Sequence, residues 1–245
     1  MFSTRSITTI VLVGATFIPL STLASEQPMG LSGSGEAGYN SSTGNTTTTS
    51  MLGAIKLNYN QERSEIKSII EVNYKSEDGT KTQERYLFDL QRNQYYDIER
   101  SYYSFIAGQF ENSRFENIDL DATLSLGLGK KLYQTDDTTL TGEIGLGYQS
   151  TTLTKSAGGD TTDQTIARLK VDFNHKINAQ LAFSQDLLVL AGSDRTKIET
   201  NTGLKAKVAD NMNVKLGYKY RHNDNPAANT KKTDTQTTLT LIYDF

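Results

Sequence analysis

The chain contains no cysteine and no tryptophan, and only three of its 245 residues are proline. Without cysteine it cannot form a disulfide framework, a thiolate metal site or a cysteine nucleophile. Its mean hydropathy is low, which excludes a bundle of membrane helices. Its net charge of −3 is too small to indicate nucleic acid as a partner. The composition is therefore compatible with a secreted or envelope protein and equally with a cytosolic one.

The first 24 residues have the features of a signal peptide. Arg5 supplies a positive charge, residues 7–20 form a short apolar run, and Thr22 and Ala24 lie at the small-residue positions of a cleavage site. The run is shorter than the roughly 20 residues that a membrane helix needs. We predict a signal peptide at residues 1–24 and a mature exported chain at residues 25–245. The alternative is a buried strand or helix.

Beyond residue 25, apolar and polar residues alternate in segments of about ten, the pattern of half-buried strands. Residues 211–222 illustrate it, with one apolar face and one face of Asn213, Lys215, Gly217, Lys219 and Arg221. We predict twelve such strands, near residues 30–39, 50–60, 64–75, 82–91, 96–110, 117–132, 138–150, 162–174, 178–190, 195–208, 211–222 and 234–245. Nothing in this part of the chain predicts a helix of useful length.

The chain ends on the sequence TLTLIYDF, which keeps large apolar residues at alternate positions up to the last one. These residues are Leu239, Leu241, Tyr243 and Phe245, and Ile242 is the exception on the other face. A membrane barrel leaves no strand edge in lipid, so we expect this strand to pair with the first one. The segment resembles the C-terminal signal by which the outer-membrane assembly machinery recognises its substrates, and we expect it to bind that machinery.

Aromatic residues lie near the ends of the predicted strands. They are Tyr39, Tyr59, Tyr74, Phe110, Tyr133, Tyr148, Phe173, Tyr220 and Phe245. Membrane barrels carry such girdles at both interfaces, whereas a soluble β-sandwich, the alternative fold, needs its aromatic residues in the middle.

The connections between predicted strands also alternate, with short turns at one rim and mostly longer polar loops at the other. Outer-membrane barrels have this pattern, with the short turns and both termini in the periplasm. The predicted fold is therefore all-β, a transmembrane antiparallel up-and-down barrel of about 12 strands in the outer membrane of a Gram-negative bacterium.

Three stretches, at residues 33–51, 100–120 and 124–149, carry a family resemblance. Their hallmarks are the sequence Ser42-Thr43-Gly44-Asn45-Thr46 and the sequence Gly127-Leu128-Gly129. With these motifs, most of the mature chain resembles the YdiY-like family, often labelled salt-induced outer membrane proteins. The resemblance implies an outer-membrane barrel and a link to salt stress, without an activity or a substrate.

The glycines of these motifs have physical interpretations of their own. Gly44-Asn45 fits a hairpin turn, because both residue types tolerate positive φ. Gly127, Gly129, Gly145 and Gly147 are predicted to face inward on adjacent strands. They could permit strand curvature, or they could leave room in the lumen.

Charged residues on the predicted inward faces form two opposed walls. The basic wall comprises Arg168, Lys170, Lys197, Lys205, Lys207, Lys215, Lys219 and Arg221, and the acidic wall comprises Glu36, Asp119, Asp121 and Glu143. Such walls could create a transverse field in a narrow pore for ions or small polar solutes, with a mild anion preference. Alternatively the charges pair with each other and fill the barrel, which would then be a non-conducting structural component of the envelope.

Candidate catalytic residues are few. His222 lies near Asp224 at the predicted outer rim, which would suit an external-rim hydrolase, but no further acidic partner is evident. We predict no enzyme activity, no cofactor and no metal site. The expected partners are outer-membrane lipid, the barrel assembly machinery and small solutes or ions, with the protein as a monomer.

Overall fold

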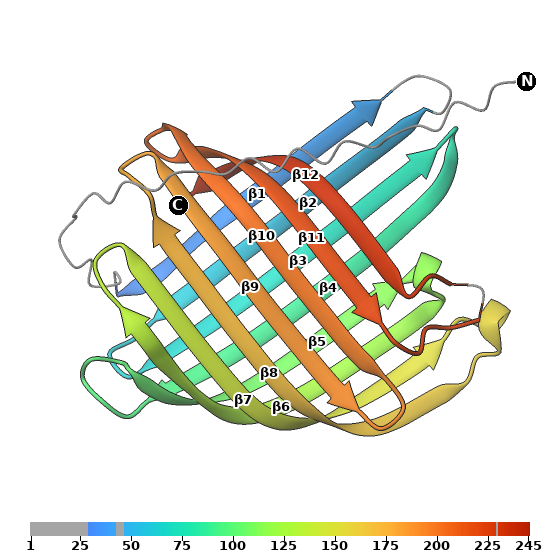
Figure 1. Ribbon diagram of the computed structural model, residues 1–245, viewed down its shortest axis with the longest axis horizontal. Helices are drawn as coiled ribbons and strands as arrows, with labels where there is room; N and C mark the ends of the chain where they lie inside the picture. The colour runs from blue at the N-terminus through green and yellow to red at the C-terminus, as the bar shows by residue number, and fades with distance from the viewer. Residues whose placement is uncertain (1–28, 43–46, 229) are drawn as a thin grey trace, which may run out of the picture.

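The computed structural model describes residues 29–42, 47–228 and 230–245 and forms a closed antiparallel barrel (Figure 1). Each strand pairs with the next in the sequence, and β12 pairs with β1 to close the barrel. The strands are β1 (Gly30–Ser42), β2 (Thr48–Asn60), β3 (Ser64–Glu77), β4 (Thr80–Tyr95), β5 (Tyr102–Ser113), β6 (Ile118–Gln134), β7 (Thr138–Leu153), β8 (Thr161–Lys176), β9 (Leu181–Gly192), β10 (Thr196–Ala209), β11 (Met212–Asn223) and β12 (Thr233–Asp244). The prediction of a twelve-stranded all-β barrel is confirmed.

Two 3-10 helices of a single turn, η1 (Arg114–Glu116) and η2 (Lys155–Ala157), lie in connections. No helix of the described residues is long and apolar enough to cross a membrane. The predicted signal peptide and the predicted Gly44-Asn45 turn lie outside the described residues.

The barrel is apolar outside and polar inside, the reverse of a soluble domain. On β6, Leu126 points outward and is 65% exposed, whereas Asp121 points inward and is only 3% exposed. Water makes an exposed apolar wall unfavourable, but the hydrocarbon of a bilayer does not. The alternation of residues along each strand therefore matches a barrel that faces lipid.

The two rims of the barrel differ, because the first strand begins and the last strand ends at the same rim. The chain enters β1 and leaves β12 at one rim, the terminal rim, where Gly33 and Phe245 exchange both backbone hydrogen bonds at 2.8 and 2.9 Å. The opposite rim, the loop rim, carries the connections that follow the odd-numbered strands. The predictions that the last strand closes the barrel and that the two ends of the barrel lie at the same rim are confirmed for the described residues. Ile242 breaks the apolar alternation of β12 because it points inward, where it is 3% exposed.

The fifth strand begins later than predicted, at Tyr102 and not at residue 96. The Asp97 carboxylate accepts hydrogen bonds from the backbone N–H groups of Ser101, at 2.9 Å, and Tyr102, at 3.0 Å, and so folds residues 96–101 into a turn. These hydrogen bonds, that of Tyr102 foremost, hold the pKa of the Asp97 carboxyl below its usual value.

The predicted contrast in loop length between the rims is wrong for two loop-rim connections. β3 and β4 are joined by Asp78 and Gly79 alone, with φ of 48° and 76°, which suits a two-residue hairpin turn. The connection from β9 to β10 is also short, at residues 193–195. The longer loops are those at 154–160 and 224–232.

Candidate functional site

The lumen is the candidate functional site, and its centre is the Arg85 guanidinium, whose side chain is 2% exposed. Its Nε donates to Glu111 at 2.9 Å and its Nη1 to Glu71 at 2.9 Å. A carboxylate oxygen of Glu199 lies 3.6 Å from Nη2. One cation on β4 therefore meets acids on β3, β5 and β10, and charge-assisted hydrogen bonds of this kind are stronger than neutral ones.

Two lysines extend this arrangement between opposite walls. Lys219 on β11 pairs with Glu71 on β3 at 2.7 Å, and Lys197 on β10 pairs with Asp121 on β6 at 2.6 Å. Each pair joins strands four places apart around the barrel, and Figure 1 shows β9 to β12 in front of β1 to β5. These residues with Arg85, Glu111, Glu199 and Arg221 form what we call the Arg85 cluster. It ties the walls together across the lumen towards the loop rim.

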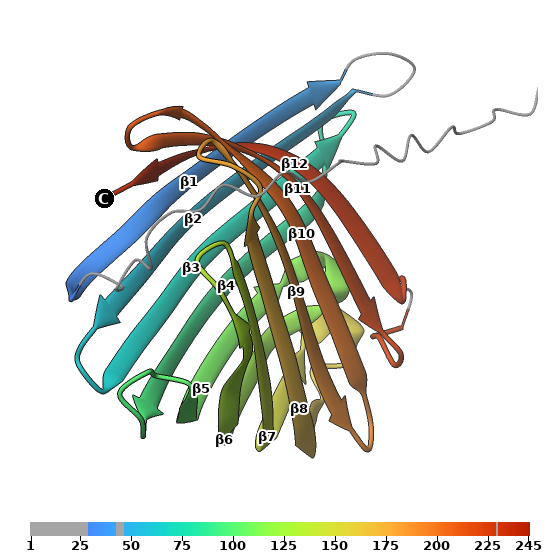
Figure 2. The ribbon, with the colours of Figure 1, turned by 60° about the vertical axis from the view of Figure 1, so that its left-hand side comes forward.

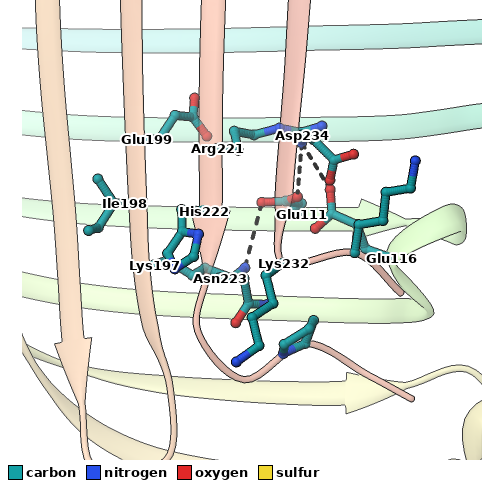
Figure 3. A pocket seen from close by; sticks show the side chains of 12 residues that line it. Glu111, Glu116, Lys197, Ile198, Glu199, Arg221, His222, Asn223, Lys232 and Asp234 are labelled. Carbon is teal, nitrogen blue, oxygen red and sulfur yellow. Dashed lines mark ion pairs between the residues drawn. The ribbon is translucent and has the colours of Figure 1, made fainter. Parts of the chain in front are cut away.

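At its outer side the Arg85 cluster borders a small pocket (Figure 3). Arg221 lies between Glu116, at 3.2 Å, and Glu111, at 3.9 Å, and Lys197 also lies 3.9 Å from Glu111. Burial raises the pKa of the Glu116 carboxyl, which lies in η1 outside the strands. The cavity of about 40 Å³ has room for a few water molecules. This pocket at the loop rim is therefore small and lined by charged residues.

A second group, the Glu143 cluster, lies deeper in the lumen. Arg168 donates to Glu143 at 2.6 Å and to Gln91 at 3.2 Å, and Gln91 in turn donates to Glu143 at 2.8 Å. The Tyr103 hydroxyl donates to the same carboxylate at 2.8 Å. The Arg168 guanidinium carbon lies 4.5 Å from the centre of the Phe105 ring, a cation–π contact.

The inward glycines make room for this cluster. A Cβ at Gly127 would lie 2.8 Å from the Phe105 ring, a Cβ at Gly145 would lie 3.0 Å from it, and a Cβ at Gly129 would overlap the Tyr103 ring. At Gly127 and Gly145 such a Cβ would come even closer to the facing backbone, to Ile144 O and Leu126 O respectively, so these glycines also permit the close approach of β6 and β7. The three glycines do not leave open space. They accept two aromatic side chains of β5, Tyr103 and Phe105, which are buried inside the barrel at this level.

Charged residues near the terminal rim pair with closer neighbours. Glu36 on β1 binds Lys56 on β2 at 2.7 Å and Lys215 on β11 at 2.6 Å. Lys205 and Lys207 have 43% and 44% of their side chains exposed, and each lies 3.6 Å from a carboxylate, of Asp244 and Asp210 respectively.

The structure brings most of the residues of the two predicted walls together. All eight members of the basic wall lie within 4 Å of a carboxylate, at distances from 2.6 to 3.6 Å for their nearest partners: Arg168, Lys170, Lys197, Lys205, Lys207, Lys215, Lys219 and Arg221. Glu36, Asp121 and Glu143 are buried and paired. The expected separation into a basic and an acidic wall is wrong, because acids and bases are interleaved.

Asp119 is a further correction. The ladder between β6 and β7 shifts register between Ile118 and Leu120. This bulge leaves Asp119 exposed, so it does not join the buried acids of the lumen. The sequence interpretation also missed Arg85, Glu71, Glu111 and Glu199. Alternation along β3 could have placed Glu71 inward, and alternation along β10, where Glu199 follows Lys197 by two residues, could have placed Glu199 inward.

The proposed catalytic pair at the rim is not joined. His222 Nδ1 lies 2.9 Å from the Thr233 hydroxyl, and Asp224 accepts the Thr196 N–H at 2.7 Å. Among the residues with described positions, no group of three or more His, Asp or Glu is arranged to hold a metal. The chemistry of the site is therefore that of a charged, hydrogen-bonded lumen.

Comparison with solved structures identifies the fold. An outer membrane channel from Pseudomonas putida F1 matches 93% of this chain and 100% of its own, with a TM-score of 0.54 and 8% identity. The translocator domain of the autotransporter NalP from Neisseria meningitidis matches 91% of both chains, with a TM-score of 0.48 and 12% identity. The first of these likenesses, at 8% identity, concerns the fold alone, which is that of an outer-membrane barrel.

Comparison of sequences gives the family. No curated protein matches the chain. The YdiY-like label therefore stays a prediction. Residues 35–245 match the family described as "Protein of unknown function, DUF481", and the chain belongs to that family.

Proposed function

We propose that the protein lies in the outer membrane of a Gram-negative bacterium and forms a narrow channel for ions or small polar solutes. The observation that carries this proposal is a lumen of charged and hydrogen-bonding side chains inside a wall that is apolar outside. Such a lumen offers polar solutes an alternative to hydrocarbon, where a charge is costly. The Arg85 cluster is the constriction of this channel.

A second candidate function is a non-conducting structural barrel, in keeping with the salt-stress label of the resemblance. The cross-lumen pairs Lys219–Glu71 and Lys197–Asp121 favour it, because a solute must separate them to pass. Removing one partner of a buried ion pair costs about 3–5 kcal/mol, because the other charge is left desolvated, and a solute that parts such a pair meets the same difficulty.

A mild anion preference belongs to the channel proposal. It is supported by the exposed ammonium groups of Lys205 and Lys207 near the terminal rim, which ions would meet first from that side. Paired charges elsewhere in the lumen leave little net field, so the preference is small.

The remaining parts of the proposal concern export and partners. Residues 1–24 direct the chain to the periplasm, and the assembly machinery binds the last strand through Leu239, Leu241, Tyr243 and Phe245. These four side chains point outward and are exposed, which suits such contact. The protein acts as a monomer and not as an enzyme.

Planar-bilayer conductance of refolded residues 25–245 tests the channel. Besides the wild type, the double variant Lys197→Met with Lys219→Met removes the cross-lumen pairs, while Glu71 keeps Arg85 and Asp121 keeps Arg195 as cationic neighbours. We expect small discrete steps for the wild type and larger ones for the variant. The matched control is Lys75→Met, whose ammonium pairs with Glu77 of its own strand and should leave the steps unchanged.

Folding is checked by the shift in gel mobility on boiling. If neither folded protein gives conductance steps, the channel proposal is overturned and the structural barrel is supported. If the double variant gives conductance steps and the wild type gives none, the ion pairs of the wild type close the channel.

A further inference from the structure

The seam between β1 and β12 is paired over a much shorter length than any other junction of the barrel. Its ladder runs only from Ser34–Asp244 to Gly38–Thr240. Beyond that point β1 stays paired with β2 up to Ser42, and β12 stays paired with β11 as far as Thr233. Both strands therefore continue towards the loop rim without each other.

The two strands diverge beyond the last ladder pair. Figures 1 and 2 show β1 and β2 running to one side while β11 and β12 run to another, with a V-shaped gap between them. A small pocket with about 10 Å³ of free volume, room for one water molecule, lies at the apex of this gap. It is lined by residues 38–40 and 50–52 on one side and 236–239 on the other, and a larger occupant would lie in the open gap above it. We call it the seam groove.

The backbone of β12 faces this gap without a ladder partner. Gly33 and Phe245 exchange backbone hydrogen bonds, while the Asp244 N–H points the other way and donates to Asn211 of the β10–β11 connection at 2.8 Å. Because directions alternate along an antiparallel strand, the backbone groups of Leu239 and Thr237 point towards β1. The ladder that ends at Gly38–Thr240 uses the Leu239 C=O, so the Thr237 N–H and C=O are the groups that face the gap beyond it. A polar backbone group left unpaired in hydrocarbon costs several kcal/mol, so an occupant that hydrogen-bonds there would be stabilised.

Side chains around the gap place it at the level of the lipid headgroups. Thr202, Tyr218 and Thr237 lie in register on the outer face of β10, β11 and β12. Tyrosine with polar neighbours is typical of the membrane interface, whereas β6 carries leucines on its outer face. Headgroups of the leaflet at the loop rim would therefore reach the seam groove.

The lining of the seam groove combines two kinds of surface. Tyr39, Met51 and Leu239 are exposed apolar side chains on its outer side. Asn40, Gln236 and Thr238 supply hydrogen-bonding groups towards the lumen, where Gln236 donates to Asn73 of β3 at 3.3 Å. None of the described residues that line the groove is charged, although 22% of the chain is charged.

From these observations we propose that the seam groove binds a single-chain amphiphile with an uncharged headgroup, which enters sideways from the membrane. The headgroup hydrogen-bonds to the amides and to the open edge of β12, and the alkyl chain lies against Tyr39, Met51 and Leu239. An anionic or cationic headgroup would lack a counter-charge in this lining. A peptide strand is less suited as an occupant. It would have to lie at the spacing of neighbouring strands from both β1 and β12, and a gap that widens does not allow this.

The test is photolabelling of the protein in lipid vesicles with an alkyl glucoside that carries a diazirine on its chain. We expect labels on residues 38–40, 50–52 and 236–239, and loss of labelling with excess octyl glucoside. Dodecyl sulfate and dodecyltrimethylammonium, below solubilising concentration, should not compete. Equal competition by all three amphiphiles would mean non-specific lipid contact and would overturn the proposal.

Engineered disulfides provide the matched control, since the chain has no cysteine of its own. Tyr39→Cys with Leu239→Cys should extend the ladder by one pair and close the apex of the gap. The reduced form lacks the Tyr39 and Leu239 side chains, so we expect it to be labelled more weakly than the wild type. The oxidised form of the same variant should not be labelled in the groove at all. Ala37→Cys with Leu241→Cys joins a pair that already faces each other in the ladder, so its oxidation should leave labelling unchanged.

Two further outcomes would overturn the inference. Slow amide exchange at Thr237, equal to that at Leu241, would show that the gap is closed in the membrane, and cross-links between copies at β12 would show a protein partner instead. The inference rests on the proposed membrane location. A bilayer-soluble apolar diazirine checks that separately, because it should label Leu126 and Ile144 whether or not the groove is occupied.

Discussion

The two ends of the lumen use their charged residues differently. Towards the loop rim, Arg85, Lys197 and Lys219 are largely buried. The two lysines pair with acids on distant strands, and Arg85 pairs with acids on both adjacent strands and lies 3.6 Å from Glu199 across the lumen. Towards the terminal rim, Lys205 and Lys207 are more exposed and pair with acids nearby. The same residue types thus act as cross-links at one end and as a solvated lining at the other.

This difference teaches that burial, and not the number of charges, decides what a charge does in this barrel. A buried ion pair loses much if one partner is removed, because the other stays desolvated. An exposed pair is worth only about 0–1 kcal/mol. Perturbing the two ends should therefore affect stability and conduction in different proportions.

The largest expected effect comes from Arg85→Ala. It leaves Glu71, Glu111 and Glu199 close together without their shared cation, which should lower the free energy of unfolding by about 3–5 kcal/mol. Urea unfolding in lipid vesicles measures this. Arg92→Ala is the control, because Arg92 is exposed and bonds only to Gln94 among the described side chains. Similar losses for the two variants would contradict the special position of the loop-rim end.

The next effect concerns the level between the two ends of the lumen, where the Tyr103 and Phe105 rings of β5 are buried. Gly129→Ala would place a methyl group in the volume of the Tyr103 ring, at a cost of about 1–3 kcal/mol. Gly53→Ala is the matched control, because a Cβ there meets nothing within 4 Å. The same unfolding measurement compares them, and equal stability would show that Tyr103 moves aside freely.

A smaller effect is expected at the terminal rim from Lys205→Gln with Lys207→Gln. Because both side chains are exposed, the free energy of unfolding should change by less than about 1 kcal/mol. The reversal potential under a salt gradient should shift towards cations, measured in the Lys197→Met, Lys219→Met background, where conductance is expected to be larger. Lys130→Gln, which removes an ammonium stacked on the Tyr102 ring of the outer face, should leave it unchanged. An equal shift in that control would remove the role of the terminal-rim lysines.

The smallest effect concerns the turn at residues 96–101. The pKa of Asp97 is lowered in the folded protein, so its stabilising contribution is present above the unfolded pKa of about 4 and is lost as the pH falls through the folded value. Asp97→Asn should therefore flatten the acid limb of the stability profile, measured by unfolding between pH 2 and pH 7. An unchanged acid limb would show that other carboxyl groups determine it.

The sequence predicts the fold well because the membrane imposes a simple alternation. The outward faces of β6, β11 and β12 follow from period two, and Phe245 marks the closing strand. The start of β5 could not be predicted, since it depends on Asp97 bonding to N–H groups four and five residues later. The bulge at Asp119 likewise could not be predicted, because it turns one residue outward without a change in the apolar–polar alternation of the sequence.

The candidate site was only half predictable for a different reason. Period two shows that Lys197, Lys219 and Asp121 share the inward side, but it does not show which residues meet across the lumen. That depends on strand tilt and register, which bring Glu71 into contact with Lys219 although the two residues are 148 positions apart in the chain. Arg85 lies in a segment of irregular pattern, so its central position appears only in three dimensions.

The fit of the Tyr103 ring over Gly129 also has a consequence for how related chains can diverge. The two positions share one volume, so neither can grow unless the other shrinks. Among members of the family, we expect a larger residue at the position of Gly129 only where the position of Tyr103 has become smaller. The glycine and the tyrosine should therefore be inherited as a pair, although they lie on different strands.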